Sequence, residues 1–179
     1  MSRLTPPVND RDHILGPADA PLTLVEYGDY ECPYCGMAYP IVEAVRRRMG
    51  DNMLFVFRHF PLTQLHPHAQ RAAEMAEAAG ERGRFWQMHG MLYQNLHALE
   101  DRDLILYAAQ IGVPPEWAAT ALHTHAFAPR VREHFLSGVR SGVNGTPTFF
   151  INGVRHDGGW DERSLFATVQ NAALVGSRR

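Results

Sequence analysis

The chain has 179 residues, of which 45% are hydrophobic and 20% are charged, and its formal net charge at pH 7 is -2. This composition is typical of a globular protein that buries one hydrophobic core. A charge so near zero argues against nucleic acid or an anionic membrane surface as a partner, and no apolar run is long enough to span a membrane. The first ten residues lack the apolar stretch of a secretion signal, so we expect a cytoplasmic location.

Residues 1–20 are rich in Pro, Asp and Gly and are predicted to be an irregular lead-in. Residues 22–27 (Leu-Thr-Leu-Val-Glu-Tyr) follow as a short, mostly apolar strand, which Gly28 and Asp29 end. Glu26 is the only charged residue on this strand. If its side chain is buried, desolvation should raise its pKa and suit it to proton transfer. A Glu26 side chain that points outward is the alternative.

The two cysteines of the chain, Cys32 and Cys35, are separated by Pro33 and Tyr34. A helical pattern follows, because apolar residues recur at every fourth position: Met37, Ile41, Val45 and Met49. Proline is favoured at the first helical position, so the motif is predicted at a strand-to-helix junction with Cys32 near the N-cap. One helical turn then brings Cys35 beside Cys32. The helix N-terminus favours the Cys32 thiolate, so we expect Cys32 to attack and Cys35 to resolve.

Two other interpretations of the CxxC pair remain open. A zinc site usually needs four ligands, and the sequence holds no second cysteine pair and no finger-like histidine spacing, so no metal site is predicted. A static structural disulfide would close a loop of only two residues, which constrains the unfolded chain little. The strand–CxxC–helix context favours redox chemistry over both.

The helix after the motif passes Pro40 and ends in a basic run before Gly50, the predicted C-cap. Residues 53–60 are almost continuously apolar, as in a buried strand, and complete a right-handed βαβ unit. From about residue 67 to residue 143 the pattern is helical, in five short amphipathic segments that we expect to stack as a bundle. The first of these is predicted to start at Pro67 and to end at Gly80.

The last part of the chain is predicted to form a β-hairpin and a helix. Residues 148–151 and 154–157 flank Asn152-Gly153, the strongest short signal for a type I′ turn. Asp161 is placed to cap a final helix.

Taken together, these motifs resemble the DsbA-like thiol–disulfide oxidoreductases of the thioredoxin fold. The resemblance rests on Leu-Val-Glu-Tyr-Gly-Asp-Tyr-Glu-Cys-Pro-Tyr-Cys, a helical stretch, and then Gly-Thr-Pro-Thr-Phe-Phe-Ile-Asn-Gly, in that order. It implies an α/β fold with a central mixed sheet of about four strands, flanked by helices. It also implies one domain over residues 1–179, with thioredoxin-fold halves at residues 20–60 and 144–179 and a helical insertion at residues 61–143.

The resemblance assigns three roles. Cys32 matches the attacking cysteine and Cys35 the resolving one. Thr146-Pro147 matches the cis-proline dipeptide that binds an extended substrate, and a plain trans turn is the alternative. Glu26 stands where the family keeps a buried acid that assists proton transfer.

The leading functional hypothesis is therefore a protein–disulfide oxidoreductase without a bound cofactor, acting on protein or peptide thiols and disulfides. The Pro33-Tyr34 dipeptide is typical of glutaredoxins, so glutathione, or another redox recycling partner, is an alternative electron source. Other classes are metal or iron–sulfur binding through shared CxxC pairs, and a peptide-binding chaperone that needs no thiol. The direction of electron flow stays open.

Overall fold

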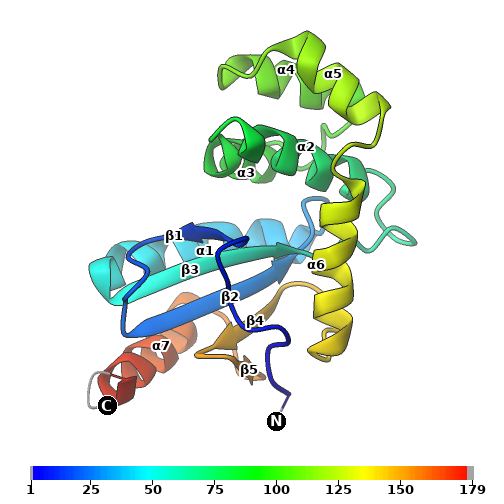
Figure 1. The fold of residues 1–179 in the computed structure, drawn as a ribbon. Helices are drawn as coiled ribbons and strands as arrows, with labels where there is room; N and C mark the ends of the chain where they lie inside the picture. The colour runs from blue at the N-terminus through cyan, green and yellow to red at the C-terminus, as the bar shows by residue number, and fades with distance from the viewer. Residues whose placement is uncertain (1, 177–179) are drawn as a thin grey trace. The chain divides into compact units, whose positions relative to one another are not determined.

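The computed structural model describes residues 2–176, which form a five-stranded sheet and seven α-helices (Figure 1). The elements in chain order are β1 (His13–Leu15), β2 (Leu22–Gly28), α1 (Pro33–Met49), β3 (Met53–His59), α2 (Ala69–Glu81), α3 (Phe85–Gln94), α4 (Asp101–Gln110), α5 (Pro115–His123), α6 (Ala128–Arg140), β4 (Thr148–Ile151), β5 (Val154–His156) and α7 (Glu162–Gly176). A single 3₁₀ turn, Gly50–Asn52, connects α1 to β3.

Two compact units can be distinguished. The sheet unit comprises the described residues of Met1–Gly28, Met37–Arg58 and Ser137–Arg179, and the helical unit comprises Asp29–Gly36 and His59–Leu136. The CxxC motif therefore belongs to the helical unit, although α1 continues from it into the sheet unit. The division into two thioredoxin-fold halves and an insertion stays a prediction.

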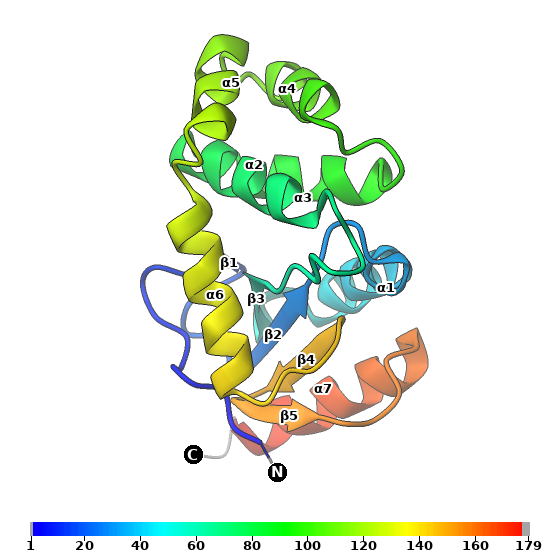
Figure 2. The same cartoon turned by 90° about the vertical axis from the view of Figure 1, so that its right-hand side faces the viewer.

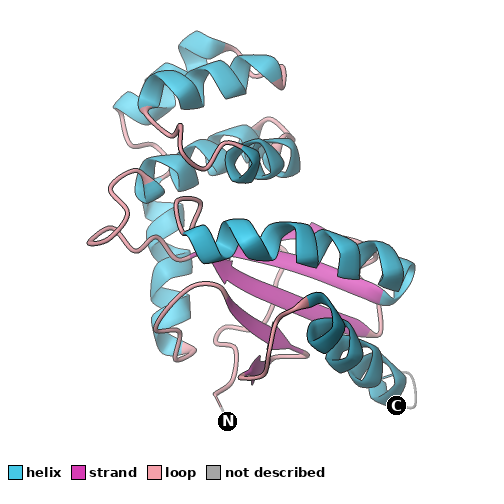
Figure 3. Ribbon diagram, turned by 180° about the vertical axis from the view of Figure 1, so that it is seen from behind, coloured by secondary structure: helices cyan, strands magenta, loops and turns pink. Residues whose placement is uncertain are grey.

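The sheet has the strand order β1-β3-β2-β4-β5. β2 and β3 are neighbours joined through α1, as the predicted βαβ unit requires, and nearly every residue of both is buried. β4 pairs antiparallel with β2, and β5 pairs antiparallel with β4. Figure 3 shows α1 and α7 on the same face of this sheet. Central strands buried on both faces explain why β2 and β3 lack polar alternation.

The prediction of an irregular lead-in was wrong for residues 13–15. These residues form β1, the fifth strand, which pairs antiparallel with the edge of β3 through His13↔Phe57 and Leu15↔Phe55. A three-residue strand carries no periodicity that a sequence pattern can detect. Its existence depends on the free edge that β3 offers.

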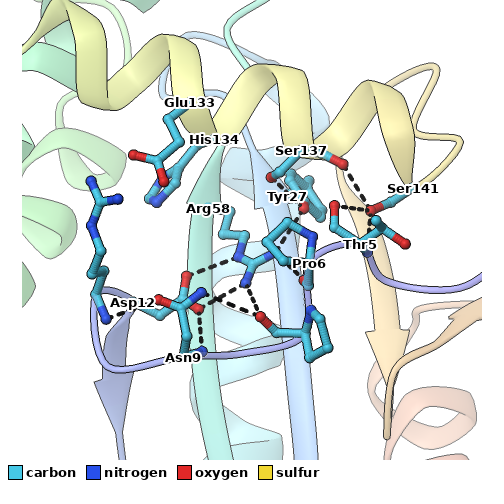
Figure 4. A network of polar contacts seen from close by, with 12 residues as sticks. Thr5, Pro6, Asn9, Asp12, Tyr27, Arg58, Glu133, His134, Ser137 and Ser141 are labelled. Carbon is cyan, nitrogen blue, oxygen red and sulfur yellow. Dashed lines mark hydrogen bonds and ion pairs between the residues drawn. The ribbon is translucent and has the colours of Figure 1, made fainter.

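A buried arginine fixes the lead-in to the sheet (Figure 4). Arg58 is 1% exposed, and its Nε and Nη2 donate to the two carboxylate oxygens of Asp12 at 2.8 and 2.7 Å. The same guanidinium donates to the carbonyls of Pro6 and Pro7 and to the Tyr27 hydroxyl at 3.0–3.1 Å. The planar guanidinium can satisfy all these acceptors at once, which is why its burial is tolerated.

The hairpin and the last helix follow the sequence prediction. Asn152 and Gly153 have φ angles of 49° and 77°, the left-handed pair that a type I′ turn requires. Asp161 caps α7 by accepting the backbone N–H of Ser164 at 3.1 Å. Both signals are local, so they were readable without knowledge of the fold.

The helical unit is built around α2, which packs against α3, α4 and α5 (Figure 2). The alanine residues of α2 are buried, and its bounds differ from the prediction by a turn or less. The helix starts at Ala69 rather than Pro67 and passes Gly80 to end at Glu81. Gly83, with φ 69°, takes the left-handed position after it, and Gly80 does not. In the described residues, no helix combines the length and apolarity needed to cross a membrane.

Candidate active site

The cysteine motif stands at the start of α1, as predicted. Pro33 is the first residue of the helix, and Cys32 directly precedes it. The Cys32 N–H donates to the carbonyl of Asp29 at 3.2 Å, and the Cys32 carbonyl accepts the N–H of Gly36 at 3.0 Å, which closes the first turn. The N-terminal end of the helix dipole is therefore located at Cys32, where it favours negative charge.

Both cysteines are buried in the structure. Cys32 is 3% exposed and Cys35 is 0% exposed, whereas Tyr34 between them is 61% exposed. Cys32 is therefore almost enclosed, which its place at the start of a helix did not by itself predict. The small remaining exposure nevertheless falls on Cys32 and not on Cys35, in the order expected of an attacking and a resolving cysteine.

Asp29, three residues before Cys32, organises the approach to the motif. Its side chain is fully buried, and Oδ1 accepts the Glu31 N–H at 2.8 Å. Oδ2 accepts the Leu62 N–H at 2.8 Å and pairs with His66 Nδ1 at 2.7 Å. One carboxylate thus joins the turn before the CxxC helix to the loop after β3.

His66 is 17% exposed at the side chain, and its pKa is raised above the ordinary value. Burial by itself lowers this pKa, but the hydrogen bond from His66 to Asp29 and the negative charges of Asp29, Cys32 and Glu31 together outweigh it. The charged form of the imidazole is therefore favoured by its surroundings.

A second carboxylate–imidazole pair is formed by the residues two positions after Asp29 and His66. Glu31 accepts the backbone N–H of His68 at 2.6 Å and pairs with His68 Nδ1 at 2.8 Å. The sequence analysis did not identify these pairs. The sequence did hold a hint of them, because two acids two residues apart, at 29 and 31, pair in order with two histidines two residues apart, at 66 and 68.

A cavity of about 490 Å³ opens beside the motif within the helical unit. Pro33, Glu31, His66 and His68 line it on one side, and the segment from Leu96 to Asp103 lines it on the other. Gly36 allows this close packing, because a Cβ at that position would lie 2.7 Å from Leu96 Cδ1. The walls of this cavity combine charged and apolar side chains next to the first turn of α1.

A buried cluster in the same unit carries metal-ligand residue types. His59, Glu77 and His134 each bring one nitrogen or oxygen atom to within 4.8 Å of the others. However, His59 Nε2 is hydrogen-bonded to Glu77 at 2.8 Å, and His134 Nδ1 accepts the His59 backbone N–H at 3.3 Å. A neutral imidazole that accepts through Nδ1 carries its proton on Nε2, which leaves no lone pair for a metal. Hydrogen bonding explains this cluster better than ligation does.

The remaining predicted site residues lie in the sheet unit. Glu26 is 2% exposed on β2, opposite Phe149 of β4, so its side chain is buried rather than turned outward. The Thr146–Pro147 peptide bond is cis and precedes β4 directly. The roles of Glu26 in proton transfer and of Thr146 and Pro147 in substrate binding stay predictions.

Comparison with known proteins agrees with this architecture. Residues 8–171 match the family model described as thioredoxin, so the chain belongs to the thioredoxin family. The α/β thioredoxin fold expected from the sequence is confirmed by solved structures.

The structure is similar to that of BdbD from Bacillus subtilis, with a TM-score of 0.82 at 23% identity over 91% of this chain and 93% of that one. It also resembles a thioredoxin-like oxidoreductase from Silicibacter pomeroyi, with a TM-score of 0.78 at 24% identity over 96% and 95% of the two chains. The alpha-DsbA1 of Wolbachia pipientis matches with a TM-score of 0.80 at 17% identity over 95% and 94%. These likenesses establish the fold.

The curated relatives are longer proteins. One named Na(+)/H(+) antiporter NhaA 1, from Salinispora arenicola, is 46% identical over 94% of this chain but only 26% of its own length. Another named Na(+)/H(+) antiporter NhaA, from Herminiimonas arsenicoxydans, is 42% identical over 98% of this chain and 28% of its own. The chain thus spans about a quarter of the length of these relatives.

Proposed function

We propose that the chain is a thiol–disulfide oxidoreductase that exchanges disulfides with protein or peptide substrates through Cys32 and Cys35. The observation that carries this proposal is the position of Cys32 directly before the N-terminus of α1, with Cys35 one turn later, in a DsbA-like thioredoxin fold. No protein group other than these thiols is needed to accept or supply the electrons.

The reaction balances within the two thiols and the substrate. The Cys32 thiolate attacks one sulfur of a substrate disulfide, the S–S bond breaks, and the other sulfur leaves as a thiolate that takes up a proton. Cys35, after losing its proton, attacks the Cys32 sulfur and displaces the second substrate sulfur. The substrate is thereby reduced by two electrons and the chain is oxidised to a disulfide. The reverse sequence oxidises a substrate dithiol.

The assignment of roles is tested by single cysteine variants. Cys32→Ser is expected to abolish both insulin reduction and the oxidation of a reduced peptide, because the attacking sulfur is gone. Cys35→Ser is expected to accumulate mixed disulfides on Cys32, because nothing resolves them. The double variant is the matched control for adducts that do not involve the motif. Adducts that form on Cys35 in the Cys32→Ser protein would instead reverse the two roles.

The direction of electron flow is tested by measuring the reduction potential of the Cys32–Cys35 pair in glutathione buffers. A thiolate that is strongly stabilised at the helix N-terminus stabilises the reduced form and makes the disulfide an oxidant, as in DsbA. A weakly stabilised thiolate leaves a reductant suited to a cytoplasm. Turnover with glutathione, compared with turnover with a dithiol protein, separates the glutaredoxin-like alternative from exchange with protein thiols.

A further inference from the structure

The environment of Cys32 contains a charge that opposes its chemistry. Asp29 is fully buried, and its carbonyl accepts the Cys32 N–H at 3.2 Å, so its carboxylate belongs to the same short turn as the cysteine. A carboxylate near a thiol disfavours the thiolate, because two like charges then share one poorly solvated region. Two of the three donors to Asp29 are backbone N–H groups, which carry no net charge.

The third donor is His66, whose Nδ1 lies 2.7 Å from Asp29 Oδ2. His66 comes from the loop after β3, and it lines the same cavity as Pro33 of the motif. His66 thus pairs with the buried carboxylate and lies beside the cavity that Pro33 of the motif also lines.

We propose that His66 is a positioning residue for Cys32: paired with Asp29, the charged imidazole offsets that carboxylate and favours the Cys32 thiolate. This inference rests on the proposed function, since it concerns the reactivity of the attacking cysteine. It assigns a role to Asp29 as well. The carboxylate holds His66 in place and in its charged form, and His66 makes the carboxylate compatible with a thiolate.

The electrostatics support this geometry. The pKa of His66 is raised although burial lowers it, and the charges that raise it include Cys32 together with Asp29 and Glu31. Coupling between two titrating groups is reciprocal, so a Cys32 thiolate that favours charged His66 is itself favoured by charged His66 to the same extent. The other charged or titratable groups around the cavity are His68, which pairs with Glu31, and His97, Glu100, Arg102 and Asp103.

The test is the pH profile of Cys32 alkylation by iodoacetamide, followed by mass spectrometry in a Cys35→Ser background. In His66→Gln, Asp29 loses its counter-charge, so the midpoint should move to higher pH and the rate near pH 6 should fall about fivefold or more. His68→Gln is the matched control, because His68 also pairs with a carboxylate through Nδ1, that of Glu31, but its side chain is 43% exposed. The alkylation profile of this variant should stay near that of the parent protein.

The Asp29→Asn, His66→Gln double variant separates charge from structure. It removes both charges, so its midpoint should lie below that of His66→Gln. An unshifted profile in His66→Gln, or a double variant with the same shift as the single one, would overturn the proposal. Because alkylation needs no disulfide substrate, this result is independent of whether the chain exchanges disulfides, which the cysteine variants decide.

A second measurement needs no substitution. The oxidised protein has no thiolate at Cys32, so the imidazole of His66, followed by NMR, should titrate at a lower pH in the oxidised protein than in the reduced one. Equal midpoints in the two redox forms would contradict the coupling, even if His66→Gln failed to fold.

Discussion

Each unit of the chain buries an aspartate against a cation at the same distance, yet the two pairs differ in kind. In the sheet unit, Arg58 Nη2 lies 2.7 Å from Asp12 Oδ2, with both side chains 2% exposed. In the helical unit, His66 Nδ1 lies 2.7 Å from Asp29 Oδ2. A guanidinium keeps its charge at every physiological pH, whereas an imidazole does not. The first pair is thus a permanent structural contact, and the second responds to pH and to the charge of Cys32.

The largest effect is expected at the permanent pair. Arg58→Met removes both guanidinium donors to Asp12 and leaves the carboxylate with the Asn9 N–H but without the charge of Arg58, so the free energy of unfolding should fall by about 3–5 kcal/mol. Arg48→Met is the matched control, since Arg48 pairs with Glu162 while 49% exposed, and it should change stability by about 1 kcal/mol or less. Urea unfolding measures both. A loss below that of the control would show that the Arg58 network is not structural.

Substitution of Asp29, the aspartate of the helical unit, should lower the free energy of unfolding by less than Arg58→Met does. Asp29→Ala leaves the Leu62 N–H without its acceptor and frees His66, which should lower the free energy of unfolding by about 1–3 kcal/mol. Asp29→Asn keeps one side-chain oxygen as an acceptor and should lose less than Asp29→Ala. If the two variants unfold at the same urea concentration, hydrogen bonding by Asp29 contributes nothing to stability.

The pH dependence of stability should distinguish the two pairs directly. The pKa of His66 is raised in the folded chain, so its contribution is fully present below the unfolded value near 6.5 and is lost as pH rises through the folded pKa. The difference in unfolding free energy between wild type and His66→Gln, about 1 kcal/mol at acidic pH, should therefore shrink toward alkaline pH. The difference between wild type and Arg58→Met should stay level over the same range. A level difference for both would contradict a titrating His66.

The smallest effect is expected where a pair is open to water. The hydrogen bond from Arg71 lowers the pKa of Asp101, whose side chain is 53% exposed. A depressed pKa gives a contribution that is present above the unfolded value and is lost as pH falls through the folded one. Asp101→Asn should therefore lower stability by about 0.2–1 kcal/mol at neutral pH and by less in acid. A loss as large as that of Asp29→Ala would show that exposure does not control these pairs.

Much of the fold was predictable because its signals are local. The β2 and β3 runs, the start of α1 at Pro33, the Asn152-Gly153 turn and the cap at Asp161 all depend on residues within a few positions of one another. The CxxC pair is equally local, since its two cysteines share one helical turn. Propensity, capping and turn chemistry act over that range, so the pattern alone determined these elements.

Only the tertiary structure decided which distant groups meet. The sequence gives no reason for His66 to pair with Asp29, for Arg58 to take Asp12, or for residues 13–15 to add a strand to β3. It also could not reveal that Cys32 is almost enclosed. Each of these depends on chain segments that are far apart in sequence and come together only when the apolar faces are buried. The sequence thus determined which atoms can react, and the packing of the folded chain determined the charges that surround them.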